Sequence, residues 1–494
     1  MTSSEPRVAK TVSWKVLLLV GMVAFGVRMG LFLLGPMSNV ERAFESDTGR
    51  YLELAQSLRT TNTFVLQHGE SPDTVYYAVQ ALRIEQGQSP ERNGVWPEGI
   101  RTPGYPVFLM PFVGWEADAG LHVALLAQCL LSAVSAMLIA WIGGVLGLLS
   151  WQSAVAGLIL AVHPCDALYA NMLLTETLAV FGMTAGLAML LLAIRRRSRI
   201  RWVTLCLAGL ILGLTCLVRP SSLAIGPALA VWLLIVLRSR AALVACVVVG
   251  LLSVLPAGAW SWRNHREGLG FRLSTVTAVH VARTAAFMPM NDAGPFEYPK
   301  DFWPHYEAFF EQVRSEIRPR ESADDAVARV AHERFRSTPA SYARLMARSA
   351  SKTLTDHSAG HLYRLLGREY YPSGMRDRFL TGQASWREFF TTALIVPLLW
   401  TGGNTLLAVL AVVGLLRLAI RRQGTTLLLL GGMMLYFIFA AQYHGDERMH
   451  LPLLGLQAIA AVFAISPRLR KAGDDSAESK DANHAERNTA CACA

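Results

Sequence analysis

Residues 14–35 read WKVLLLVGMVAFGVRMGLFLLG and decide the fold class, because they form an apolar run long enough to cross a bilayer. A transmembrane helix needs about 20 such residues. The preceding stretch, residues 1–13, carries basic side chains and lacks a small-residue cleavage site. We therefore expect the run to be retained as a membrane anchor and not removed as a signal peptide.

Further apolar segments predict an all-α membrane protein, a polytopic helical bundle of about ten or more transmembrane helices. The 494-residue chain is 53% hydrophobic and only 17% charged, whereas soluble domains average about 25% charged. The other predicted spans are 119–149, 152–169, 173–194, 202–218, 222–237, 241–260, 390–418, 424–441 and 450–466. The segment PGYPVFLMPFVGW at 103–115 is too short and proline-rich to cross comfortably, so we expect a re-entrant or interfacial position.

Basic residues cluster on one side of the predicted membrane. Threading the chain through ten spans puts four clusters on the same side as the N-terminus: RRRSRIR at 195–201, RSR at 238–240, RLAIRRQ at 417–423 and PRLRK at 467–471. Because cytoplasmic loops collect Lys and Arg near span ends, both termini are predicted to be cytoplasmic. The net charge of +10 then follows from topology, with the lipid bilayer and no nucleic acid as the partner.

This topology divides the chain into four parts. They are an N-terminal membrane catalytic region at 1–262 with an extracytoplasmic first loop at 38–103, an extracytoplasmic, mainly helical cap at 263–387, C-terminal transmembrane helices at 388–466 and a disordered cytoplasmic tail at 467–494. Helical patterns at 322–337 and 340–355 support the cap, and Ser322 followed by Asp325 indicates a capping-box-like helix start.

The first outer loop places a carboxylate, Asp47, ahead of an amphipathic helix in FESDTGRYLELAQSLRTTNTF at 44–64. The apolar face of this helix, built at spacings of three and four residues, consists of Tyr51, Leu54, Ala55 and Leu58. Such a helix lies on a membrane surface or against other helices. Asp47 is interpreted either as the N-cap of the helix or as a functional residue.

Other ionisable residues are predicted at the same outer side. They are Glu176 in LLTETLAV, Arg219 in CLVRPSS, Arg263 in SWRNHREG and Arg448 in YHGDERMHLP. Each has a structural alternative: complementing a helix dipole for the acid, and snorkelling or anchoring headgroups for the arginines. However, arginines at outer span ends run against the positive-inside bias, and ionisable groups at membrane depth are functional candidates. Together with Asp47 they indicate a site for a phosphate-bearing lipid.

Other motifs are weak or lacking. His357 and His361 in DHSAGH have a spacing that can hold a metal, but Gly360 weakens the helix which that spacing requires, so no metal site is predicted. The sequence contains neither a G-x-x-x-x-G-K-[ST] loop nor a G-x-G-x-x-G motif after a strand, so a nucleotide site is unsupported. An outward-facing site would need a substrate already delivered across the membrane.

Taken in order, the motifs resemble a known superfamily. They are SDTGRYLELAQSL, IRTPGYPVFLMPF, LLTETL, GLTCLVRPS, WRN and ERMHLPLLGLQAIAA. This order and shared sidedness resemble the GT-C integral membrane glycosyltransferases, specifically the branch containing protein O-mannosyltransferases and the lipid A aminoarabinose transferase. The resemblance covers most of residues 14–466.

The resemblance implies roles for individual residues. Asp47 matches the family's catalytic aspartate, and Tyr51 follows it as in the D-x-x-x-Y pattern. Arg101, ahead of Pro103, matches a basic residue that contacts the donor phosphate. The chain departs from the family in having a residue between that arginine and the proline, and in having Thr48 where many members carry a second acid.

The implied function is transfer of a sugar, with inversion, from a polyprenyl-phosphate donor to an extracytoplasmic lipid, glycan or protein. Asp47 would act as general base. The arginines expected to stabilise charge on the departing phosphate are Arg101, Arg263 and Arg448. The expected supporting residues are Tyr51, Glu176 and Arg219. No cofactor is expected, although a divalent cation bridging the two acids is an alternative.

A second class of function stays open, because the same outward arginines suit a lipid-linked sugar flippase or transporter that forms no bond. Transporters commonly show paired internal repeats with broken helices, and we find no such symmetry in this sequence. The resemblance implies a multi-pass protein of a bacterial inner (plasma) membrane with an extracytoplasmic active site.

Overall fold

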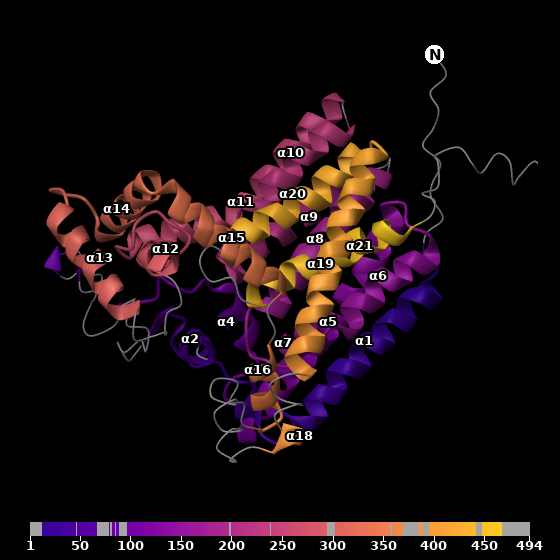
Figure 1. The fold of residues 1–494 in the computed structure, drawn as a ribbon, viewed down its shortest axis with the longest axis horizontal. Helices are drawn as coiled ribbons and strands as arrows, with labels where there is room; N and C mark the ends of the chain where they lie inside the picture. Colours follow the sequence, from indigo (N-terminus) through magenta and orange to yellow (C-terminus); the bar gives the residue numbers. More distant parts are fainter. Residues whose placement is uncertain are drawn as a thin grey trace, which may run out of the picture.

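The computed structural model describes residues 12–45, 47–66, 79, 82–83, 85–87, 96–196, 199–237, 239–293, 302–355, 358–368, 385–388, 395–440 and 447–466. These residues are mostly helical, with one short antiparallel strand pair, β1 (Val65–Leu66) and β2 (Trp96–Pro97). Figure 1 shows a bundle of long helices with a group of shorter helices to one side.

Eight described helices are long and apolar enough to cross a membrane, so this is an integral membrane protein. They are α1 (Trp14–Leu34), α5 (Ala119–Val145), α8 (Glu176–Arg195), α9 (Arg199–Val218), η3 (Pro220–Ser222) with α10 (Ile225–Leu237), α11 (Arg240–Arg266), α19 (Val396–Ile420) and α21 (Glu447–Ile465). Two shorter apolar helices, α6 (Ser150–Val162) and α20 (Gly424–Ala440), account for the remaining predicted spans. The predicted polytopic helical bundle is confirmed.

The remaining elements are short or amphipathic. They are η1 (Val40–Ala43), α2 (Thr48–Thr61), α4 (Gly104–Leu109), η2 (Glu116–Asp118), α7 (Pro164–Tyr169), α12 (Val276–Ala293), α13 (Phe302–Glu316), α14 (Ala323–Ser337), α15 (Pro339–Thr355), α16 (Ala359–Leu365) and α18 (Trp386–Glu388). Helix α4 covers part of the segment predicted to be re-entrant or interfacial, and its six residues are too few to span a bilayer.

The most buried of the membrane helices is α21, which packs against α6, α8, α19 and α20. A glycine permits its closest contact with α19. A Cβ atom added at Gly414 would lie only 1.8 Å from the backbone oxygen of Ala460. Small residues let helix backbones approach closely in membranes, where packing rather than water exclusion drives helix association.

One predicted span is divided by a proline. The segment 152–169 forms two helices, α6 and α7, because Pro164 lacks a backbone N–H and disfavours a helical residue before it. His163, at the break, has extended backbone angles and its side chain accepts a hydrogen bond from the backbone N–H of Cys165 over 3.3 Å. The break turns the chain toward the start of α8.

Helices α12, α13 and α14 share a core of their own. It includes Phe309 and Val327, and Leu82 from the first loop joins it. Arg83, next to Leu82, forms a two-pronged ion pair with Asp324 at 2.7–2.9 Å. Leu82 and Arg83 of the first loop are therefore packed and ion-paired with these helices. Figure 1 shows α12, α13 and α14 beside the bundle, with α15 between them and the bundle.

The predicted helical patterns of this region are present as α14 and α15. The Ser322 side chain accepts a hydrogen bond from the backbone N–H of Asp325 over 3.2 Å, as the predicted helix start requires.

A buried ion pair lies inside the bundle, where the sequence analysis did not expect one. Arg28 of α1 has no exposed surface, and its guanidinium binds the carboxylate of Asp166 in α7. Arg28 Nε also donates to Ser132 Oγ of α5 over 2.8 Å. Because an unpaired charge is costly inside a membrane, these contacts tie α1, α5 and α7 together.

We expect Asp166→Ala to lower the free energy of unfolding by about 3–5 kcal/mol, because it leaves the Arg28 charge buried without its partner. Unfolding in mixed micelles, followed by circular dichroism, would measure this loss. A double variant, Arg28→Met with Asp166→Leu, removes both charges and should regain most of the stability. A single variant as stable as the wild type would show that the pair does not hold these helices.

Candidate active site

Asp47 lies just before α2 and is held by two arginines. Its side chain makes no capping hydrogen bond, so its carboxylate does not cap the helix. Arg101 Nη2 donates to Asp47 Oδ1 over 2.7 Å, and Arg448 Nη2 lies 3.5 Å from Oδ2. The Asp47 side chain is 31% exposed, so the carboxylate stays accessible from outside the protein.

Glu176, the first residue of α8, has a fully buried side chain that is also bound by two arginines. Arg219 Nη1 lies 2.8 Å from Glu176 Oε1, and Arg448 Nε donates to the same oxygen over 2.7 Å. Thr175 donates its hydroxyl to the other oxygen over 3.3 Å. A buried carboxylate requires such partners, since burial removes its hydration. Glu176 is therefore engaged in specific ion pairs and does more than complement a helix dipole.

Arg448 joins these two sets of contacts into one chain. We call the result the ion-pair network; in order of contact its members are Arg101, Asp47, Arg448, Glu176 and Arg219. All five were predicted as site residues, and the structure brings them together from the first loop, the segment before α4, the starts of α8 and α21 and the end of α9. Figure 1 shows α2, α4 and α7 grouped at one end of the bundle.

Arg101 carries a buried hydrogen-bond donor that is not paired among the residues that the structure describes. Its side chain is 13% exposed, and within the described part of the chain its buried Nε–H finds no acceptor. Its guanidinium lies 5.7 Å from the ring centroid of Tyr51. A buried donor without an acceptor is uncommon in folded proteins and calls for an explanation, such as a ligand or water.

Tyr51 packs beside the ion-pair network. Its ring meets that of Tyr105 edge-on at 5.0 Å, and the Tyr105 hydroxyl donates to Gln128 Oε1 over 2.7 Å. These contacts fix α2 against α4 and α5. The structure thus places the predicted supporting residue Tyr51 in packing contacts.

The structure places Arg263 outside the ion-pair network. Arg263 donates to the backbone oxygens of Phe64 and Glu98, over 2.9 and 3.1 Å. Its guanidinium also lies over the rings of Phe64 and Trp260, at 5.6 and 5.0 Å. Because Phe64 and Glu98 flank β1 and β2, Arg263 holds the strand pair against the end of α11.

The arginines set the protonation state of Asp47. Burial raises the pKa of the Asp47 carboxyl, but Arg101 and then Arg448 outweigh this effect, so the pKa lies below its ordinary value. Burial and the neighbouring Asp47 charge raise the pKa of the Tyr51 hydroxyl. At neutral pH the site therefore holds an ionised aspartate and a neutral tyrosine.

Sequence reasoning missed two residues that shape this site. Glu98, three residues before Arg101, is 2% exposed, and its Oε2 lies 3.7 Å from Arg101 Nη1. Thr48 donates its hydroxyl to the backbone oxygen of Leu173 over 3.1 Å, which ties the Asp47 loop to the segment before Glu176. The three-residue spacing of Glu98 and Arg101 is visible in the sequence. The contact of Thr48 with Leu173, which are 125 residues apart, is not.

The sequence leaves open a divalent cation that bridges Asp47 and Glu176. In the structure Asp47 and Glu176 do share a partner, which is the guanidinium of Arg448. Among the described residues, no group of three or more His, Cys, Asp or Glu side chains has the arrangement of a metal site. His357 lies outside the described residues, and His361 pairs with Glu45.

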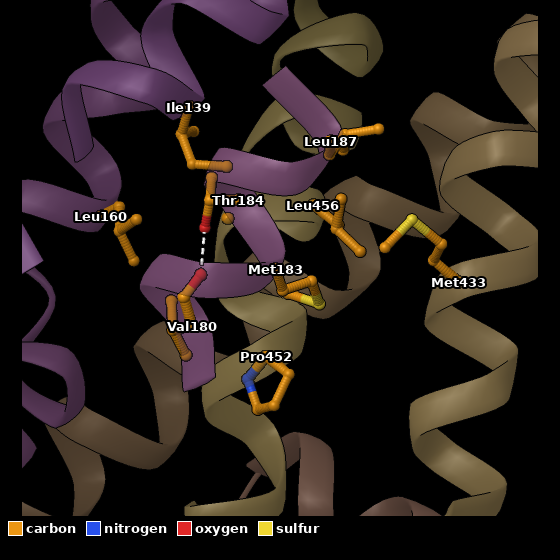
Figure 2. A pocket seen from close by; sticks show the side chains of 10 residues that line it. Ile139, Leu160, Val180, Met183, Thr184, Leu187, Met433, Pro452 and Leu456 are labelled. Atoms are coloured by element: carbon orange, nitrogen blue, oxygen red, sulfur yellow. Dashed lines mark hydrogen bonds between the residues drawn. The ribbon is translucent and has the colours of Figure 1, made fainter. Parts of the chain in front are cut away.

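A small apolar pocket lies inside the bundle. It is lined by residues of α8 and α21 that lie further along these helices than Glu176 and Arg448. Figure 2 shows it between Ile139, Leu160, Met183 and Pro452. The hydroxyl of Thr184 is bound to the backbone of its own helix. With a volume of about 10 Å³, the pocket is near the limit for one water molecule. We interpret it as a packing gap.

We expect Arg101→Gln to raise the pKa of Asp47, because burial then opposes ionisation with one fewer positive charge to offset it. Asp47 would become protonated at a higher pH than in the wild type. Carbodiimide modification of Asp47, quantified by peptide mass spectrometry across roughly pH 2 to 7, would detect the shift. Arg329→Gln removes an arginine paired with Glu321 elsewhere and should leave the profile unchanged. Superimposable profiles for Arg101→Gln and wild type would contradict the assignment.

Comparison with known proteins gives only matches of low sequence identity, all of them among solved structures. No family model and no curated protein sequence matches the chain. Among solved structures, the oligosaccharyltransferase AglB from Archaeoglobus fulgidus, in complex with an inhibitory peptide and a dolichol-phosphate, matches with 14% identity and a TM-score of 0.46 over 92% of this chain. The match spans 50% of the length of AglB.

A second match is ArnT from Cupriavidus metallidurans. Its structure bound to undecaprenyl phosphate matches with 16% identity and a TM-score of 0.36, covering 91% of this chain and 77% of ArnT.

Proposed function

We propose that this protein is a membrane glycosyltransferase that moves a sugar from a polyprenyl-phosphate donor to an extracytoplasmic lipid, glycan or protein. The motif order supports this reading. The observation that carries it is the ion-pair network, in which three arginines and two acids from distant parts of the chain converge at one end of the membrane bundle.

The chemistry of the ion-pair network suits a phosphate-bearing ligand. Guanidinium groups bind phosphate oxygens through paired, charge-assisted hydrogen bonds. Arg101 keeps a buried Nε–H without an acceptor among the described residues, and Asp47 is partly exposed beside it. A lipid phosphate entering beside Arg101 and Arg448 would supply the acceptor and leave its polyprenyl chain in the bilayer.

The reaction would be a single displacement at the anomeric carbon. The acceptor oxygen forms a bond to that carbon as the bond from carbon to phosphate oxygen breaks, and the electron pair leaves with the phosphate. Asp47 takes the proton of the acceptor hydroxyl. One displacement inverts the anomeric configuration. Arg101 and Arg448 stabilise the charge that develops on the leaving phosphate.

Donor binding would also activate the base. In the unliganded site the carboxylate of Asp47 balances Arg101 and Arg448, which lowers its pKa and makes it a weak base. A phosphate that draws these arginines toward itself weakens both pairings. Burial then acts on Asp47 with less opposition, so its basicity rises when the donor is in place.

The remaining predicted residues act indirectly in this proposal. Glu176 and Arg219 hold Arg448 in place, and Arg263 acts through the strand pair that it supports. Basic loop clusters at the opposite end of the bundle support a cytoplasmic position for that end, and the site would then face outward. Acceptor contacts would then come from the helices of the predicted cap.

We expect Asp47→Asn to reduce sugar transfer roughly 10² to 10⁴-fold, because it removes the general base while keeping the side-chain size. The assay is transfer of radiolabelled sugar by the purified protein from a panel of polyprenyl-phosphate sugars to membrane extract, with and without a chelator. Activity that survives the chelator would support a metal-independent reaction.

Asp118→Asn is the matched control, because it removes an exposed carboxylate outside the ion-pair network. Equal transfer by wild type and Asp47→Asn would refute the role of Asp47. If neither transferred any sugar of the panel but both bound the lipid equally, the transporter interpretation would replace the enzyme.

We expect Arg448→Gln to weaken binding of a polyprenyl phosphate about ten- to a hundred-fold, since a hydrogen bond to a charged group contributes about 1.5–3 kcal/mol. Binding would be measured in nanodiscs with a labelled lipid. Arg314→Gln removes an arginine paired with Glu85 and Glu311 and should bind the lipid normally. Unchanged affinity in Arg448→Gln, with a normal melting temperature, would exclude Arg448 from the lipid site.

A further inference from the structure

The turn at residues 98–101 is organised around one buried carboxylate. Glu98 Oε1 accepts hydrogen bonds from the backbone N–H groups of Ile100 and Arg101, over 2.5 and 2.9 Å. The other oxygen, Oε2, lies 3.7 Å from Arg101 Nη1. The side chain is 2% exposed, so these contacts replace most of its hydration.

The same turn is held from outside by the segment after α11. The backbone N–H of Thr275 donates to Gly99 O over 2.8 Å, and Ser274 donates its hydroxyl to the backbone oxygen of Ile100. The turn also packs closely against Leu269, because a Cβ added at Gly99 would come within 2.9 Å of a terminal methyl of that side chain. The backbone from which Arg101 projects is thus clamped on both sides.

We propose that Glu98 is the positioning residue for Arg101. Its carboxylate fixes the turn through two backbone N–H groups and balances the guanidinium charge through its second oxygen. Arg101 is then held toward Asp47 with its Nε–H unused, ready for a ligand phosphate. The role of that phosphate rests on the proposed function, whereas the positioning of Arg101 does not.

The two oxygens of Glu98 make separable predictions. Glu98→Gln keeps one oxygen that can accept from the two N–H groups but loses the charge, while Glu98→Ala loses both. We expect Glu98→Ala to weaken binding of undecaprenyl phosphate about ten-fold, and Glu98→Gln to weaken it less. Combined with Arg101→Gln, neither change should weaken binding further, because Glu98 acts through Arg101.

A second measurement does not depend on any lipid. Amide hydrogen exchange in peptides covering residues 99–102 should be faster in Glu98→Ala than in wild type, with Glu98→Gln between them. The matched control is Glu321→Gln. Like Glu98, Glu321 accepts a hydrogen bond from a nearby backbone N–H, that of Arg318 at 3.0 Å. It also pairs with an arginine, Arg329, at 2.9 Å. That variant should change neither binding nor exchange at 99–102.

The outcomes separate this inference from the proposed function. The positioning role would be overturned if Glu98→Ala weakened lipid binding by the same factor in the wild type and in the Arg101→Gln background. Unchanged amide exchange at 99–102 in Glu98→Ala would overturn it as well. If wild type neither bound nor transferred polyprenyl-phosphate compounds, the proposed function would fail, and the exchange measurement alone would decide whether Glu98 holds the turn. Melting temperatures in detergent identify any variant that loses its fold.

Discussion

Arg448 bridges two carboxylates, and the architecture of the site depends on that bridge. Asp47 belongs to a loop and Glu176 to the start of a membrane helix, so a single guanidinium fixes the loop relative to the bundle. Arg448 itself is carried by α21, the most buried of the membrane helices. Any movement of that helix would therefore change the contacts of both acids. The site is built into the packing of the bundle rather than attached to its surface.

The ion-pair network is better explained by ligand binding than by stability. Removing two charges from water costs several kcal/mol for each ion, and apolar residues of similar volume often stabilise a fold as well or better. The Arg28–Asp166 pair deeper in the bundle shows what a closed structural pair looks like here, with both side chains at 0–4% exposure. Asp47, by contrast, is 31% exposed, and Arg101 keeps a buried donor without an acceptor among the described residues. Those two features are what the proposed ligand site rests on.

The sequence predicted the bundle well because each span carries its own signal, a run of apolar residues of the right length. It failed where a local feature breaks the run, as at Pro164, where one predicted span became two helices. Four residues of the ion-pair network were indicated by their position at a span end or in a loop on the same side, whereas Arg101 was indicated only by the family resemblance. Arg263 matched the same rule, yet its partners are backbone oxygens, which no residue pattern reveals. Likewise, Arg28 pairs with Asp166 across 138 positions, a distance at which sequence spacing carries no information.

The lowered pKa of Asp47 bears on the proposed role of this residue as a general base. A carboxylate held by two arginines is stable as an anion and takes up a proton poorly, so in the unliganded state it is a weak base. The same arginines are the groups that would bind the donor phosphate. Their two roles cannot be fulfilled completely at once, because each guanidinium has a limited set of donors. In the proposed function, competition between carboxylate and phosphate for Arg101 and Arg448 would therefore link donor binding to the basicity of Asp47. Under the same proposal, Glu98 would keep Arg101 oriented and partly charge-balanced while Asp47 gives up its share of the contact.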